Sequence, residues 1–207
     1  MTWKHHIFGD EENLGLIKNL SKRIGICKKL RKSMPLSKFK QMVAGIFTSK
    51  LIYGITVWGG IWNLEGQQNL NNTSISKEAM RKLQVCQNKI MRLISGLDYL
   101  TSTNVLLETT NQLSVHQLVA YHTACQVYKT SKSKLPVYHF NRLFETKENV
   151  IQNKSVDFQL TLGKSNFFYQ SSILWSLLPT DIQNAQTIGS FKRKCKAWVK
   201  TNISIRP

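Results

Sequence analysis

Residues 76–96 read SKEAMRKLQVCQNKIMRLISG, and this stretch decides the fold class. Ser76 suits an N-cap and Gly96 suits the left-handed residue that ends many helices, so together they predict a helix over Lys77–Ser95. At about 100° per residue, the apolar and basic side chains separate onto opposite arcs. The apolar arc holds Met80, Leu83, Cys86, Ile90, Leu93 and Ile94, and the basic arc holds Lys77, Arg81, Lys82, Lys89 and Arg92. Periodicity alone leaves open whether the basic face is merely solvated or contacts phosphates.

A second basic amphipathic helix is predicted over Asn13–Lys32. Its apolar stripe contains Leu16, Ile17, Leu20, Ile24, Cys27 and Leu30. The lysines fall on the other side of the helix. Three of them join the candidate phosphate contacts: Lys18, Lys22 and Lys29.

The next segment, Leu36–Trp62, is predicted as one long helix that follows a break at Pro35. Its large apolar residues recur at one-face helical spacing. The part from Met42 onward approaches the length of a membrane span, but Lys50 near its middle favours a buried helix. The tryptophans at apolar-periodic positions are predicted core residues: Trp58, Trp62, Trp175 and Trp198.

The C-terminal half is also mostly helical by these criteria. Helices are predicted over Thr101–Leu113, Ser114–Ser131 and Phe191–Lys200, the last capped by Ser190. Its outward cations form a third candidate basic face: Lys192, Arg193 and Lys196.

One β element is expected between these helices. Phe158-Gln-Leu-Thr-Leu alternates like a strand, and Gly163 begins a turn toward Phe167-Phe168-Tyr169, which predicts a small β-hairpin near residues 158–169. The predicted fold class is therefore mainly α. It consists of a helical unit over residues 1–100 and a helical C-terminal region over residues 101–207 that contains the hairpin.

The charge of the chain points to a polyanionic partner. The sequence has 29 Lys and Arg against 11 Asp and Glu, which gives a net charge of +18 at neutral pH. With 42% hydrophobic residues, it is too apolar for a disordered basic tail. A folded chain with this much like charge repels itself unless a polyanion neutralises it, and nucleic acid is the commonest such partner. The alternative is a basic protein without such a partner.

The cysteine spacing and the N-terminal residues suggest an intracellular protein, nuclear or cytoplasmic. Cys27, Cys86, Cys125 and Cys195 lie far apart and form no CxxC or zinc-ligand pattern, so we expect reduced structural thiols and no cofactor. The residues from Met1 to Ile7 contain no apolar region of the kind found in a signal peptide.

No catalytic site is predicted. Polymerase or nuclease chemistry needs carboxylates that converge on Mg²⁺, and the only acidic cluster is Asp10, Glu11 and Glu12 before a helix, where acids favour the helix dipole. The five histidines form no hydrolase pattern, and no glycine-rich loop precedes a helix in a nucleotide-binding arrangement.

Five segments, in order along the chain, carry a more specific sequence pattern. They are Thr2–Ile7 (TWKHHI), Ile24–Ile26 with Lys29–Arg31 (IGI and KLR), Leu51–Gly59 (LIYGITVWG), Leu83–Ile94 (LQVCQNKIMRLI), and Phe167–Lys192 with its WSLLP and SFK elements. This series resembles the thumb and post-thumb region in the reverse transcriptases of LINE-type, jockey-like non-LTR retrotransposons. Ser176 departs from the family pattern, which has Asn after the tryptophan.

The resemblance implies a function. In that family the thumb holds the primer–template duplex, while the aspartates that bind Mg²⁺ lie upstream in the palm. We therefore expect a 5′-truncated fragment of an RNA-directed DNA polymerase that lacks the palm, is not itself an enzyme, and binds RNA or an RNA–DNA duplex with little sequence preference. Two alternatives stay open: a protein-interaction fragment that acts, and self-associates, through the apolar helix over residues 42–62, or a relic without function.

Overall fold

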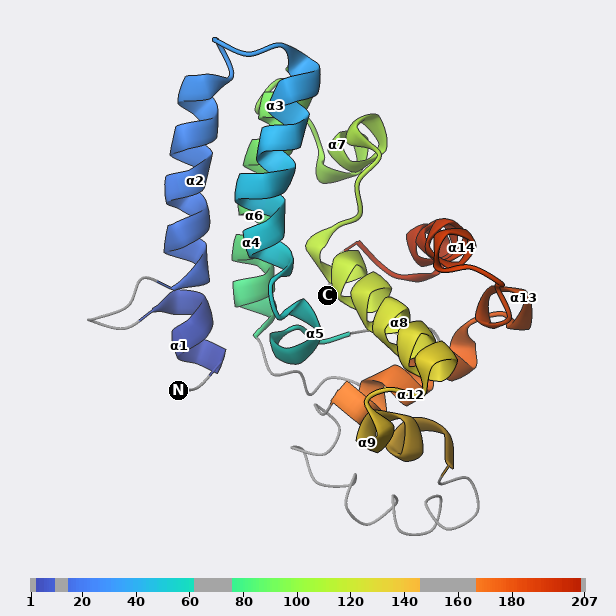
Figure 1. The fold of residues 1–207 in the computed structure, drawn as a ribbon. Coiled ribbons are helices and arrows are strands. Elements are labelled where there is room, and N and C mark those ends of the chain that lie inside the picture. Colours follow the sequence, from blue (N-terminus) through green and yellow to red (C-terminus); the bar gives the residue numbers. More distant parts are fainter. Residues whose placement is uncertain (1–2, 10–14, 62–75, 146–166, 206–207) are drawn as a thin grey trace. The chain divides into compact units, whose positions relative to one another are not determined.

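Helices dominate the protein, which is described by a computed structural model over residues 3–9, 15–61, 76–145 and 167–205. These residues contain no β-strand (Figure 1), and the predicted mainly α class is confirmed. The chain divides into two compact units, one of residues 1–58 and 75–115 and the other of residues 59–74 and 116–205.

The first unit is built on α6 (Lys77–Ser95), which has the predicted bounds. Ser76 Oγ accepts a hydrogen bond from the Ala79 amide, and Gly96 ends the helix in the left-handed conformation at φ 73°. The predicted apolar arc faces the core, since Met80 and Leu83 are at most 1% exposed. Both capping predictions for this helix are confirmed.

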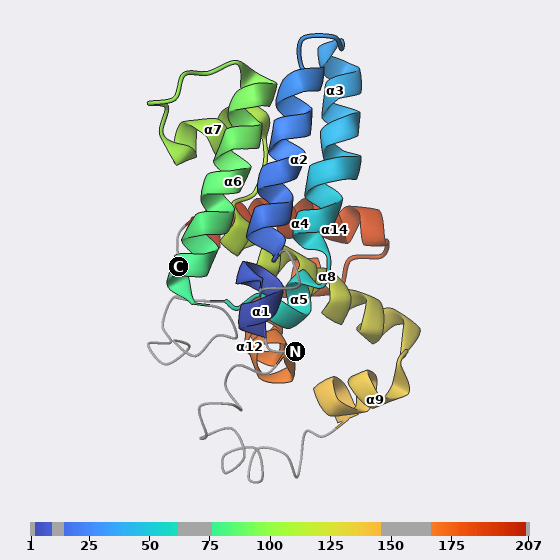
Figure 2. The same ribbon diagram turned by 90° about the vertical axis from the view of Figure 1, so that its left-hand side faces the viewer.

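Two helical segments lie along α6, as both ribbon views show (Figures 1 and 2). They are α2 (Leu16–Leu30) and the segment that begins with α3 (Leu36–Val43). The short helix α1 (Trp3–Phe8) packs against α2, and α7 (Thr103–Thr110) packs against α6. The apolar side of α2 is buried in this bundle, at Leu16, Leu20 and Cys27.

The prediction of one continuous helix over Leu36–Trp62 is wrong. The segment consists of α3, a π-helical stretch η1 (Ala44–Thr48), α4 (Ser49–Ile52) and, after a turn, α5 (Ile55–Trp58). Gly54 stands in that turn at φ 63°, a left-handed conformation that glycine adopts without steric cost.

The broken segment still supplies the core that its apolar pattern predicts. Phe39, Phe47 and Trp58 are at most 1% exposed. The Trp58 Nε1–H donates to the Tyr53 carbonyl oxygen at 2.8 Å and thereby closes the turn around Gly54. No helix in the described ranges is long and apolar enough to cross a bilayer. Trp62, the predicted end of this helix and a predicted core residue, lies outside the described ranges.

Amide side chains of α6 bind the chain on both sides of α7. Gln87 Nε2 donates to the Leu113 carbonyl oxygen at 2.8 Å, and Gln84 Oε1 accepts from the Val115 amide at 2.8 Å. At the other end of α7, Asn88 Nδ2 donates to Thr103 Oγ1 at 2.9 Å. One polar stripe of α6 therefore fixes both the entry to α7 and the chain that follows it.

The second unit has six described helical elements. They are α8 (Val115–Ser133), α9 (Val137–Phe140), η2 (Asn141–Glu145), α12 (Phe167–Leu177), α13 (Thr180–Gln183) and α14 (Ile188–Asn202). The Tyr128 ring of α8 stacks on the Phe191 ring of α14 at 4.2 Å between centroids. Twelve residues beyond Phe191, the Ile203 carbonyl oxygen accepts a bond from Gln117 Nε2 at 2.9 Å. The later residue of α8 thus contacts the earlier residue of the C-terminal segment, so these two segments run antiparallel.

The predicted hairpin is not supported. Phe167, Phe168 and Tyr169, its expected second strand, form the first turn of α12. Residues 158–166, its expected first strand and turn, lie outside the described ranges. The aromatic run favours a strand locally, but an apolar segment of this length is equally compatible with a packed helix, and here Leu174 is fully buried.

The cap predicted for the last helix is displaced by three residues. Thr187 Oγ1 accepts from the Ser190 amide at 3.2 Å, so Thr187 is the N-cap and Ser190 lies in the first turn of α14. Both hydroxyl residues precede the same apolar run, and both residue types suit a cap, so the sequence did not distinguish them.

Candidate nucleic-acid interface

Three predicted cations of α6 are exposed on its outer face: Lys77, Arg81 and Lys89. They lie within roughly 120° of the helix circumference, opposite the buried arc. The ion pairs among described side chains do not involve them. We refer to these three residues as the α6 outer cations.

The other two predicted cations of α6 have partners inside the unit. Lys82 pairs with Glu78 at 2.8 Å, and its Nζ lies 5.1 Å from the centre of the Phe8 ring. Arg92 donates from Nε to the Asp98 carbonyl oxygen at 3.2 Å and from Nη2 to that of Thr101 at 3.0 Å. Arg92 therefore holds the loop between α6 and α7, while Lys82 is partly neutralised.

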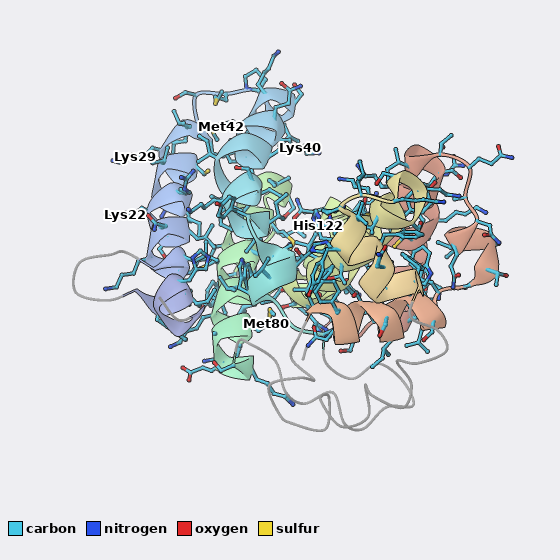
Figure 3. The ribbon with its side chains drawn as sticks, turned by 60° about the horizontal axis from the view of Figure 1, so that its bottom comes forward. Lys22, Lys29, Lys40, Met42, Met80 and His122 are labelled. Atoms are coloured by element: carbon cyan, nitrogen blue, oxygen red, sulfur yellow. The ribbon has the colours of Figure 1, made fainter. Side chains whose placement is uncertain are left out.

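The helix α2, predicted over Asn13–Lys32, and the turn after it carry the largest group of exposed cations in the described part of the first unit. Five lysines of α2 and the turn after it fall within roughly 120° of the helix circumference. They form the lysine ridge: Lys18, Lys22, Lys28, Lys29 and Lys32, all exposed. Figure 3 shows Lys22 and Lys29 on the outer side of α2. The described side chains provide no ion pair for any of the five.

Lys89 borders the line of contact between α2 and α6. Burial raises the pKa of the Cys86 thiol on α6, while a hydrogen bond with Ser21 of α2 and the charge of Lys89 lower it by smaller amounts. Ser21 and Lys89 are therefore both close to Cys86. Around the helix axis Ser21 lies between Lys28 and Lys32, so one edge of the lysine ridge and one α6 outer cation flank the same helix–helix contact.

Two arginines, one in α2 and one directly after it, were not predicted as contacts and are structural. Arg23 Nη1 donates to the Ile46 carbonyl oxygen at 2.6 Å. Arg31 Nε donates to the Leu93 carbonyl oxygen at 3.0 Å, and its guanidinium lies 5.4 Å from the centre of the Phe39 ring. Both arginines stand four residues from the buried Cys27, on the apolar side of the helix. That spacing is the sequence signal that could have predicted their structural role.

The third predicted basic face belongs to the second unit. Lys192 and Arg193 are exposed on α14, whereas Lys196 is half-buried, and burial lowers its pKa. The neighbouring Lys194 forms an ion pair with Asp181 at 3.1 Å. This face is smaller than the lysine ridge and is a separate candidate surface.

Exposed aromatic rings also accompany the basic helices. Tyr99 is 77% exposed and Tyr53 is 69% exposed. Among the predicted core tryptophans, Trp58 is fully buried as expected, while Trp175 and Trp198 are half-buried. The helical pattern identified no exposed ring, because both tyrosines stand in turns, where periodicity gives no orientation.

The described residues offer little chemistry of other kinds. They contain no group of three or more His, Cys, Asp or Glu side chains that could hold a metal ion. Asp10, Glu11 and Glu12 lie outside them. All four cysteines are free and buried, and burial raises the pKa of each thiol, that of Cys195 to about 12. The thiols are therefore protonated at neutral pH.

Comparisons of the chain with protein-family models, curated proteins and solved structures find no match.

Proposed function

We propose that the first unit binds the phosphate backbone of a nucleic acid through the lysine ridge of α2 and the α6 outer cations. The lysine ridge carries the proposal, because it places five exposed positive charges on one arc without an ion pair among the described side chains. Such a surface repels itself until a polyanion neutralises it. Lysine contacts to phosphates carry no information about the bases, so the binding is tolerant of sequence.

The resemblance to LINE-type reverse transcriptases supports RNA or an RNA–DNA duplex as the polyanion. Within that proposal, residues 1–207 correspond to a thumb and post-thumb region and do not themselves catalyse polymerisation. Purified protein with Mg²⁺, primer–template and deoxynucleotides is then expected to extend no primer above background. Primer extension that exceeds a control without protein, and that persists after the protein is purified again, would contradict this part of the proposal.

A protein-binding surface along residues 42–61 has less support. Six of its large apolar residues are at most 2% exposed: Val43, Phe47, Leu51, Ile55, Trp58 and Ile61. Most of the apolar pattern that suggested a docking helix is thus buried within the folded chain, and Tyr53 and Val57 are the large apolar residues that stay exposed, at 69% and 54%.

The test is an anisotropy titration against duplex and single-stranded RNA and DNA at several salt concentrations. Releasing counterions makes log K fall with log[salt], with a slope of about −0.9 for each neutralised phosphate on duplex DNA. Replacing Lys18, Lys22 and Lys29 by Gln should flatten that slope by up to roughly three units. Replacing Lys77, Arg81 and Lys89 should act in the same direction.

A matched control removes three exposed charges from the C-terminal end of α8 and the residue after it, by replacing Lys129, Lys132 and Lys134 with Gln. The control should leave the slope close to that of the wild type. Equal flattening by all three variants would mean that net charge, not these faces, drives the binding. Absence of salt-dependent binding by the wild type would reject the proposed function.

A further inference from the structure

Tyr99 stands in the loop between α6 and α7, at the C-terminal end of the basic side of α6. That loop projects from the upper end of α6 in Figure 2. The Tyr99 side chain is 77% exposed and the adjacent Leu100 is 86% exposed. Tyr99 and Leu100 thus expose apolar side chains beside the cations of α6.

The loop is held by hydrogen bonds on both sides of the ring. Asp98 Oδ1 accepts from the Tyr99 amide at 2.6 Å, and the Thr101 amide donates to the Asp98 carbonyl oxygen at 3.2 Å. Arg92 donates to the carbonyl oxygens of Asp98 and Thr101. The backbone that carries Tyr99 is therefore fixed to α6, and little conformational entropy remains to be lost when the ring is covered.

Arg92 also defines one face of the ring. Its guanidinium carbon lies 5.3 Å from the centre of the Tyr99 ring. Around the helix axis, Arg92 projects between Arg81 and Lys89, so the ring belongs to the same arc as the α6 outer cations. With a cation on one face and 77% of the side chain exposed, the opposite face is open to a flat partner.

We infer that Tyr99 is a stacking platform for one unpaired base of the nucleic acid that the first unit binds. The inference rests on the proposed function and adds a substrate preference to it. A base can stack on the ring only where it is not already stacked between neighbours, so Tyr99 selects single-stranded segments or strand ends over the interior of a duplex. Lys89, the α6 outer cation nearest to this loop in the sequence, holds an adjoining phosphate, and the stacked base fixes the position of the strand.

The experiment compares an oligouridylate single strand with long duplex RNA, whose ends are a negligible share of its binding sites. Tyr99→Leu should weaken single-strand binding by about 5- to 150-fold, the range that one stacked base supplies. It should leave duplex binding and the salt slope unchanged, because no phosphate contact is lost. Tyr99→Phe keeps the ring and should bind the single strand within about twofold of the wild type.

Tyr53→Leu is the matched control, since Tyr53 is exposed in the same unit and has Lys50 5.6 Å from its ring centre. The inference is overturned if Tyr99→Leu binds the single strand like the wild type, or if Tyr53→Leu loses as much affinity. Salt-dependent binding whose affinity is unchanged by Tyr99→Leu would reject the stacking role of Tyr99 but not the proposed function. A wild-type protein that binds neither probe would reject both the stacking role and the proposed function.

Discussion

The Nε–H of Arg31 donates to the carbonyl oxygen of Leu93, 3.0 Å away, and so ties the residue after α2 to the last turn of α6. The last carbonyl oxygens of a helix have no partner within the helix, and a cation near them also opposes the negative end of the helix dipole. One side chain thus serves as a C-terminal cap for a helix that lies 62 positions away in the sequence.

Arg31→Met should lower the free energy of unfolding by about 1–3 kcal/mol, because it removes a charged hydrogen bond and leaves the Leu93 carbonyl oxygen without its donor. Chemical denaturation followed by circular dichroism measures the change. Lys32→Met removes an exposed neighbouring charge and should stay within about 0.5 kcal/mol of the wild type. Equal losses in the two variants would show that the capping bond contributes nothing.

Gly54→Ala and Gly25→Ala form a matched pair with opposite expected signs. At Gly54, φ is 63°, and an added Cβ would meet Trp58 Cδ1 at an ordinary contact distance of 3.5 Å, so strain alone should cost about 1–2 kcal/mol. At Gly25, in the middle of α2, an added Cβ meets nothing within 4 Å, and alanine should stabilise the helix by about 0.5–1 kcal/mol. Thermal unfolding of both variants checks the signs, and a neutral Gly54→Ala would argue against the break in the helix.

Thr187→Ala should destabilise the second unit by about 1 kcal/mol, because the Ser190 amide loses its acceptor. Ser190→Ala should cost less, since the Ser190 side chain does not cap α14. Urea denaturation of the two variants distinguishes the assignments. A larger loss of stability in Ser190→Ala than in Thr187→Ala would identify Ser190 as the N-cap, as the sequence predicted.

Burial lowers the pKa of His116, with a smaller opposing effect from its bond to the Ser204 carbonyl oxygen. The unfolded chain therefore binds this proton more tightly than the folded chain does. The stability that neutral His116 contributes is complete above the unfolded pKa of about 6.5 and is lost as the pH falls through that value toward the lower folded pKa. Burial shifts His6 and His122 in the same direction.

The free energy of unfolding should accordingly decrease between about pH 7 and pH 5. His116→Gln should reduce that slope by at most about 1.4 kcal/mol per pH unit, the limit for one proton. Urea titrations of both proteins across this range provide the measurement. An unchanged slope would mean that His116 does not contribute to the acid sensitivity.

Arg81→Gln and Arg92→Gln remove the same charge from α6 but should differ in stability. The exposed Arg81 should be replaceable within about 0.5 kcal/mol. Loss of Arg92 removes the donors for the Asp98 and Thr101 carbonyl oxygens and should cost about 1–2 kcal/mol. Equal melting temperatures would show that the loop does not depend on Arg92.

Much of the first unit was predictable because its signals are local. The cap, the apolar period and the final glycine of α6 all lie within the helix that they specify. The break at Gly54 was not predictable, since a glycine inside an apolar helical pattern costs only about 1 kcal/mol and tertiary packing decides. The predicted strand Phe167–Tyr169 failed for a similar reason, because packing in α12 overrides a local aromatic preference.

The candidate site was predictable only in part. Helical periodicity correctly predicted that Lys77, Arg81 and Lys89 face outward. It cannot distinguish an exposed cation from one that has a partner inside the unit. Long side chains reach partners that lie several residues away, so Lys82 and Arg92 were grouped with the exposed cations although both have contacts inside the unit. Tyr99 was missed because a turn gives no periodic signal.

The amides Gln84, Gln87 and Asn88 have a consequence for how relatives of this chain would diverge. Each makes a hydrogen bond of fixed geometry to the chain next to α7, so a substitution at any of them disturbs the fold. A phosphate contact, in contrast, tolerates any cation that reaches the same arc, and can move from one helical turn to the next. Selection would therefore preserve the glutamine–asparagine pattern and let individual lysines drift. A motif search built on this helix would retrieve the shared scaffold, and would report little on whether a retrieved chain still binds its ligand.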